Sequence, residues 1–103
     1  MFVNATEDID ELVSAGGVAL VYFHAQWCSS CSALNPVIMD IAEVRYPDVR
    51  VIGVYINTFP ALATHYAVSS LPVFHLYKNG ALLDTRSGAV SKWDLIKFVE
   101  SVL

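Results

Sequence analysis

The sequence predicts an α/β fold with a central mixed sheet of four to five strands and helices on both faces. Along the first two thirds of the chain, apolar runs rich in β-branched residues alternate with segments of helical periodicity. Such strand–helix–strand units pair their strands in parallel. Farther along, Lys78-Asn79-Gly80 separates two strand-like runs, and Asn-Gly is a strong hairpin signal that adds an antiparallel edge.

Length and composition predict one compact domain over residues 1–103. Hydrophobic residues make up 55% of the chain and charged residues 16%, which is typical of a well-filled interior. No linker or repeat interrupts the sequence. A net charge of −4 without a basic cluster gives no electrostatic reason to bind nucleic acid or an anionic membrane. The longest apolar runs are far too short to span a bilayer.

The first 17 residues contain acidic residues but no lysine or arginine, so they do not resemble a signal peptide. Two cysteines are also too few for the disulfide scaffold of a secreted protein. Both observations favour a cytoplasmic setting, with an organellar one left open.

The N-terminal elements follow from periodicity and stop signals. A helix is predicted over about Thr6 to Ser14, with acidic residues in its first turn and Gly16-Gly17 ending it. A short strand at Phe2-Val3 is a further candidate. Val18 to Phe23 contains too few polar residues for a half-exposed strand, so it should be central and covered on both faces.

A second helix is predicted from Cys28 to about Tyr46, because apolar residues recur there at helical spacing. Pro36 falls inside it and removes one backbone hydrogen bond, so we expect a kink. Pro47-Asp48 ends the helix.

The remaining elements complete the sheet and its cover. A last helix begins at Ser91, which with Asp94 resembles a capping box. Histidine and aromatic side chains in this half, namely His75, Trp93 and Phe98, are interpreted as packing residues. The other predicted segments are a strand at Val49 to Ile56, a short helix at Pro60 to Tyr66, and hairpin strands at Val73 to Tyr77 and Ala81 to Thr85.

The only two cysteines lie three residues apart in Trp27-Cys28-Ser29-Ser30-Cys31, where a strand passes into a helix. The first turn of a helix has unpaired N–H groups and the positive end of the helix dipole, and both favour a thiolate over a thiol. The spacing of i and i+3 also puts both sulfurs on one helical face within bonding reach. The motif predicts a dithiol that cycles with a disulfide.

Metal binding is the main alternative for this pair. Zinc normally takes four ligands, and His24, His65 and His75 show no paired ligand spacing around the single Cys-x-x-Cys. We therefore predict no metal and no cofactor besides the Cys28–Cys31 disulfide, although an iron–sulfur cluster shared between two chains stays open as an alternative.

Nearly the whole chain resembles the thioredoxin family. The matching landmarks appear in the family's order: Trp27-Cys28-x-x-Cys31, Pro36, Leu71-Pro72, the Lys78-Asn79-Gly80 turn and Gly88. The resemblance implies the thioredoxin fold, an exposed nucleophile at Cys28, and a resolving cysteine at Cys31. It also implies a cis-proline at Pro72 and a substrate-binding surface that includes Trp27 and Leu71.

The chain departs from the family pattern in two places. Ser29-Ser30 replaces Gly-Pro, and serine hydroxyls that donate to the Cys28 thiolate would make the protein more oxidising than the roughly −270 mV of thioredoxin. Tyr22 and Gly53 occupy the positions of the family's buried aspartate and its assisting lysine. Because tyrosine is a poor base near neutrality, either Cys31 resolves the mixed disulfide more slowly or another group takes the role. His24, on the same sheet face, is the candidate for proton exchange.

These residues support two classes of function. The first is a protein-disulfide reductase that receives electrons from an upstream thioredoxin reductase, a partner implied only by the resemblance. The second, an alternative to this leading function, is a binding module on the thioredoxin fold with weak redox turnover, for which the missing aspartate and lysine are the argument. An oxidase or isomerase is compatible with the same residues and depends on the redox potential.

Overall fold

The computed structural model describes residues 2–4, 9–25, 28–58, 60–66, 68, 71–88 and 90–103. Five strands form one sheet in the order β1-β3-β2-β4-β5. The first three in that order pair in parallel, and β4 and β5 add antiparallel pairs. The predicted mixed sheet is therefore confirmed. The strands are β1 (Phe2–Asn4), β2 (Val18–His24), β3 (Arg50–Tyr55), β4 (Val73–Lys78) and β5 (Ala81–Ser87).

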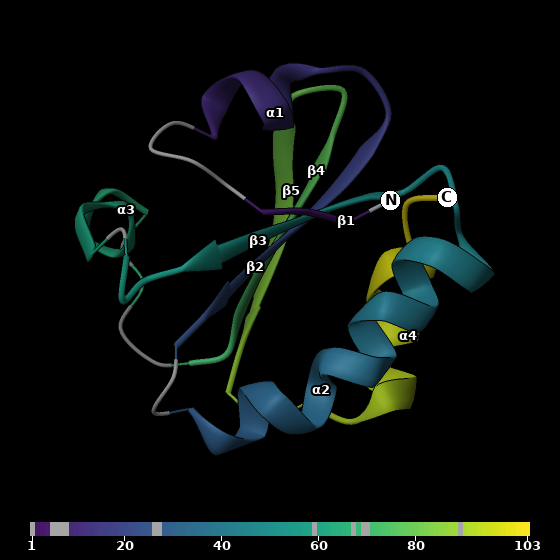
Figure 1. The fold of residues 1–103 in the computed structure, drawn as a ribbon. Coiled ribbons are helices and arrows are strands. Elements are labelled where there is room, and N and C mark those ends of the chain that lie inside the picture. The colour runs from purple at the N-terminus through teal and green to yellow at the C-terminus, as the bar shows by residue number, and fades with distance from the viewer. Residues whose placement is uncertain are drawn as a thin grey trace.

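Helices cover both faces of this sheet, as predicted. In Figure 1, α2 and α4 lie on one face, while α1 and α3 lie on the other. Among the described residues, none of the helices is long and apolar enough to cross a membrane. The helices are α1 (Asp10–Ser14), α2 (Ser29–Met39), the π-helix η1 (Asp40–Arg45), α3 (Pro60–His65) and α4 (Lys92–Glu100).

Strand β2 lies in the middle of the sheet, which confirms the prediction for Val18 to Phe23. Every residue from Val18 to Phe23 is buried. Neighbouring side chains on a strand point to opposite faces. Leu20 and Tyr22 accordingly join the core under α2 and α4, whereas Val21 and Phe23 join the core on the α1 side.

The predicted helix from Cys28 to Tyr46 is correct only in its first part. Helix α2 passes through Pro36, but from Asp40 the backbone continues as η1, and the N–H of Tyr46 donates to the carbonyl of Ile41, five residues back. The wider π turn keeps Ile41 and Ala42 both fully buried against the sheet. Sequence periodicity does not distinguish this geometry from an α-helix.

The predicted hairpin joins β4 to β5. Asn79 and Gly80 have φ of 51° and 85°, the left-handed pair that a type I′ turn requires. Asn79 also holds the loop before β2: its Oδ1 accepts from Gly17 N at 2.8 Å, and its N–H donates to Gly17 O at 2.9 Å. The turn is thus fixed to a segment 62 residues away.

Strand β5 forms one edge of the sheet, and all seven of its residues are exposed. Its pairing with β4 is irregular at Leu76 and Tyr77. On this strand, Arg86 Nη1 lies 2.8 Å from Asp84 Oδ2, and the Arg86 guanidinium stacks on the Phe98 ring.

One predicted boundary and one packing prediction need correction. Helix α1 begins at Asp10, with Ile9 as its N-cap, and residues 6–8 of the predicted helix lie outside the described residues. Ser91 caps α4 as predicted, since its Oγ accepts from Asp94 N at 3.1 Å. Phe98 is buried, but Trp93 is 64% exposed, so its assignment as a packing residue is wrong. An aromatic residue on a short amphipathic helix fits either face by composition alone.

Candidate functional site

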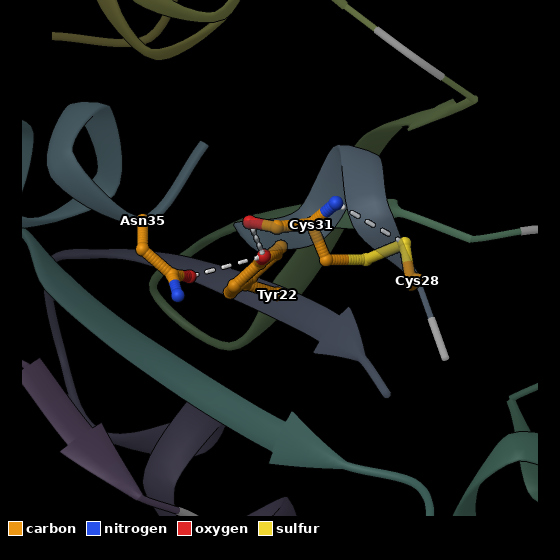
Figure 2. The surroundings of a disulfide bond; sticks show 4 residues. All are labelled: Tyr22, Cys28, Cys31 and Asn35. Atoms are coloured by element: carbon orange, nitrogen blue, oxygen red, sulfur yellow. Dashed lines mark hydrogen bonds between the residues drawn. A yellow bond between two sulfur atoms is a disulfide. The ribbon is translucent and has the colours of Figure 1, made fainter. Parts of the chain in front are cut away.

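The site is built on the junction between β2 and α2. Cys28 and Cys31 form a disulfide, with their Cα atoms 5.3 Å apart. Cys28 has extended backbone and is the N-cap of α2, while Cys31 lies in the first turn. Figure 2 shows both sulfurs on the same side of the helix end. The predicted pairing within bonding reach is confirmed.

The sulfur of Cys28 occupies the position that a capping oxygen takes in other helices. Cys28 Sγ accepts a hydrogen bond from Cys31 N at 3.2 Å. A donor at this distance, together with the positive end of the helix dipole, stabilises negative charge on the sulfur once the disulfide opens. The backbone geometry therefore favours the Cys28 thiolate in the reduced protein.

Both cysteines are buried in this disulfide form. Cys28 is 5% exposed and Cys31 is 2% exposed, so the expected exposure of Cys28 is not found. Both belong to the core cluster on the α2 and α4 face of the sheet. Cys28 is still the more exposed of the two.

We expect Cys28 of the reduced protein to be alkylated by iodoacetamide at pH 7 faster than a free cysteine, because thiolate is the reacting form. Peptide mass spectrometry after brief labelling should place the first modification on Cys28, since Cys31 lies one turn inside the helix. Cysteine in solution, which lacks a capping N–H, is the reference. Equal rates for Cys28 and the free amino acid would contradict the stabilised thiolate.

Tyr22 connects the central strand to the redox helix. Its side chain is 1% exposed, and its Oη donates to the Cys31 carbonyl at 2.8 Å (Figure 2). The Asn35 amide lies beside the same hydroxyl, with Oδ1 at 3.4 Å. Burial raises the pKa of Tyr22 to about 12, so the phenol stays protonated and serves as a permanent donor. Tyr22 therefore holds Cys31 in place and is no base near neutral pH.

Gly53 on β3 pairs with Tyr22 on β2, so the two positions that depart from the family pattern lie side by side. A Cβ at Gly53 would lie 2.7 Å from Phe2 Cζ, closer than side chains tolerate. Phe2 from β1 thus fills the space that a longer residue at 53 would need. This arrangement leaves Tyr22 without a charged neighbour at that position.

His24 lies on the same sheet face as Tyr22, as predicted. The two rings stack with centroids 4.7 Å apart and planes 7° apart. Burial lowers the pKa of His24, so its imidazole is neutral at pH 7. Its Nε2 is buried and has no hydrogen-bond partner among the described residues. The ring can exchange a proton through Nε2 without first breaking a hydrogen bond.

Two histidines, the buried His75 and the half-buried His24, should make stability depend on pH. Burial lowers the pKa of both His24 and His75. Below about pH 6.5 the unfolded chain binds protons that the folded protein does not, so the free energy of unfolding falls as the pH decreases from about 7.5 to about 5. Urea unfolding at the two pH values measures this change.

The variant His75→Phe keeps an aromatic ring beside Phe23 and Tyr66 but removes one of these titrating groups. Its loss of stability between the two pH values should be smaller than that of the wild type. An equal loss in both proteins would show that His75 is not the source.

Of the remaining predicted site residues, the structure describes Leu71 and Pro72. The Leu71–Pro72 peptide bond is cis, and the Pro72 carbonyl accepts from Gly88 N at 2.9 Å. Leu71 is half-buried. Trp27, like the side chains of Ser29 and Ser30, lies outside what the structure describes.

Sequence reasoning missed Asn35 and Phe74. Asn35 is four residues after Cys31, on the same helical face, so helical spacing could have found it. Phe74 stacks on Tyr22 at 5.2 Å from the adjacent strand, and only the register of β4 reveals that contact.

Metal ligation is not supported by the described part of the chain. It contains no group of three or more His, Cys, Asp or Glu side chains placed to hold an ion. The neighbours of the cysteines are instead an aromatic stack and backbone donors and acceptors.

Comparisons with known proteins agree with this geometry. The chain is 33% identical over 92 residues to thioredoxin from Rickettsia bellii, covering 89% of this chain and 88% of that one. It is 30% identical to thioredoxin Y1, a chloroplastic protein of Arabidopsis thaliana, over 91% of this chain but only 55% of the relative's length. The structure of a mutant thioredoxin from Halobacterium salinarum superposes with a TM-score of 0.84 at 29% identity, covering 98% of this chain and 88% of that one.

The family assignment rests on both sequence and fold. The thioredoxin family model matches residues 1–101. The mixed sheet, the cysteine pair at the start of α2 and the cis-proline supply the family's structural landmarks. The chain therefore belongs to the thioredoxin family.

Proposed function

We propose that the protein is a thiol–disulfide oxidoreductase that reduces disulfides of other proteins through the reversible Cys28–Cys31 pair. The observation that carries this proposal is the hydrogen bond from Cys31 N to the sulfur of Cys28 at the start of α2. This hydrogen bond stabilises the thiolate of Cys28, the residue that attacks the target disulfide. The cysteine pair and the thioredoxin homologues support the same activity.

The reaction transfers two electrons in two displacements. The Cys28 thiolate attacks one sulfur of a target disulfide; that bond breaks, and the other target sulfur leaves as a thiolate that takes up a proton. Cys31 then loses its proton and attacks Cys28 Sγ. The mixed disulfide breaks, the second target thiolate departs, and the Cys28–Cys31 disulfide of the structure is formed.

Two neighbouring side chains assist the second displacement in this proposal. Tyr22 positions Cys31 through the 2.8 Å hydrogen bond to its carbonyl. His24 is neutral at pH 7, and its Nε2 has no hydrogen-bond partner among the described residues. It can therefore accept the proton of Cys31, which the buried Tyr22 cannot. Comparing turnover of His24→Ala and wild type between about pH 6 and 8 tests this role. Superimposable profiles would remove His24 from the mechanism.

The proposal also includes partners and setting. Protein disulfides are the substrates, Leu71 and Pro72 with Trp27 form the docking surface, and a thioredoxin reductase returns the electrons. This places the protein in redox homeostasis and electron transfer. Relatives include bacterial and chloroplastic thioredoxins, which supports a cytoplasmic or organellar location.

Insulin reduction tests the function directly. Vigorous precipitation of insulin in the presence of dithiothreitol, above the rate of dithiothreitol alone, is the expected result. A rate no higher than that background would instead favour the alternative of a binding module. Titration against glutathione buffers then gives the potential; a value at or below roughly −270 mV would contradict the more oxidising poise suggested by Ser29-Ser30.

A further inference from the structure

Phe2 on the edge strand β1 lies against the ring of His24. A Cβ placed on Gly53 would be 2.7 Å from Phe2 Cζ and 3.5 Å from His24 Nε2, so the phenyl ring and this nitrogen meet in the space beside Gly53. His24 Nε2 has essentially no accessible surface and no hydrogen-bond partner among the described residues. The phenyl ring of Phe2 is thus part of what excludes water from this nitrogen.

Backbone contacts on two sides hold Phe2 in this position. Strand β1 pairs in parallel with β3, with Phe2 beside Val51 and Asn4 beside Gly53. The N–H of Phe2 also donates to Glu43 Oε1 of η1 at 3.0 Å. Because Gly53 has no side chain, the ring has room to lie over β3. The sequence departure at position 53 therefore allows Phe2 to cover His24.

This cover lies between His24 Nε2 and a cavity that water can enter. The cavity, of about 260 Å³, is partly open to solvent between β1, β2 and α2, and both Phe2 and His24 line it. Without the phenyl ring, the space beside Gly53 would join this cavity. Water there would supply the hydrogen bond that Nε2 lacks and would solvate an imidazolium ion.

The groups around His24 offer little charge that would act on it instead. Among the described residues that line the cavity, none is a carboxylate, a lysine or an arginine. The titratable rings beside His24 are Tyr22 on β2 and Tyr55 on β3, with centroids at 4.7 and 5.3 Å. Glu43 on η1 is a carboxylate on this side, and it contacts the backbone of Phe2. Burial is accordingly the cause of the lowered pKa of His24.

We propose that Phe2 is a positioning residue of the redox site: it keeps His24 uncharged by covering Nε2, and so widens the pH range in which His24 can take the proton of Cys31. The contribution to turnover rests on the proposed function, whereas the cover over Nε2 does not. Phe2 acts through His24 and not through contact with the substrate.

The test is an NMR titration of the His24 ring in the oxidised protein, compared between wild type and Phe2→Ala. Without the phenyl ring, the pKa of His24 should rise toward its usual value of about 6.5, because water can then solvate the imidazolium ion. Phe2→Leu still fills most of the space and should raise the pKa less. An unchanged His24 pKa in Phe2→Ala would overturn the proposal.

The matched control is Val3→Ala, on the same strand. Neighbouring side chains on a strand point to opposite faces, so this variant weakens the packing of β1 without opening space at His24 Nε2. It should leave the His24 titration unchanged; a rise equal to that of Phe2→Ala would show a general loosening of β1 and overturn the cover. If Phe2→Ala does not fold, comparing Phe2→Leu with Val3→Ala decides the same question.

Insulin reduction separates this inference from the proposed function. The ratio of the rate at about pH 6 to that at about pH 8 should be lower for Phe2→Ala than for wild type, because more of its His24 is protonated at the lower pH. A raised His24 pKa with an unchanged ratio would support the cover but contradict its role in turnover. Absence of insulin reduction by the wild type would contradict the proposed function and leave the NMR result standing.

Discussion

Replacing Cys28 with serine should lower dithiothreitol-dependent insulin reduction to the rate of dithiothreitol alone. Serine retains an oxygen at the N-cap of α2, so the cap and the fold should be preserved. A hydroxyl near neutral pH is, however, almost entirely protonated and cannot form a disulfide. The measurement is the rate of insulin precipitation for variant and wild type at equal concentration, with circular dichroism confirming that both are folded.

The matched variant is Cys31→Ser, which keeps the attacking sulfur and removes the resolving one. It should also lose turnover, but it should accumulate a mixed disulfide with the target that non-reducing electrophoresis detects. Cys28→Ser should form none. Mixed disulfides through Cys31 in the Cys28→Ser protein would reverse the two assigned roles.

Replacing Phe74 with alanine should reduce the free energy of unfolding by about 3–5 kcal/mol. Phe74 is completely buried on β4, where its ring stacks on Tyr22 at 5.2 Å. Truncation leaves a cavity next to the side chain that holds Cys31. Since domains of this size are stable by only about 5–15 kcal/mol, the loss is a large share of the total. Urea unfolding followed by circular dichroism measures it.

Phe74→Leu serves as the control because it retains most of the buried volume, and it should cost less than half as much as the alanine variant. The alanine variant should additionally slow the release of the mixed disulfide, since Tyr22 is then less firmly placed. A loss below about 1 kcal/mol in Phe74→Ala would show that this site collapses around the missing ring.

Local patterns in the sequence were enough to predict most of the fold. Val18 to Phe23 is apolar on both of its alternating faces, and only a central strand buries both. Asn79-Gly80 predicted the hairpin because a type I′ turn needs two residues with positive φ. The cysteine pair was also predictable from local spacing, because two residues three apart on a helix bring their sulfurs to one face.

What sequence reasoning could not supply depends on contacts between distant segments. The hydrogen bond from Tyr22 to Cys31 requires the exact placement of α2 on β2, and the stacking of Phe74 requires the register of β4. The change to a π-helix at Asp40 preserves the apolar periodicity, so no pattern marks it. Burial of Cys28 in the disulfide is likewise a property of packing and not of the motif.

The outermost strand of the sheet has a consequence for behaviour at high concentration. An exposed edge strand can pair with the edge strand of another molecule and so start aggregation. On β5, the charges of Asp84 and Arg86 and the irregular pairing with β4 oppose pairing between two such edge strands. Those two side chains thus act as gatekeepers, and variants that neutralise both should be handled as prone to fibrils even where they remain fully folded.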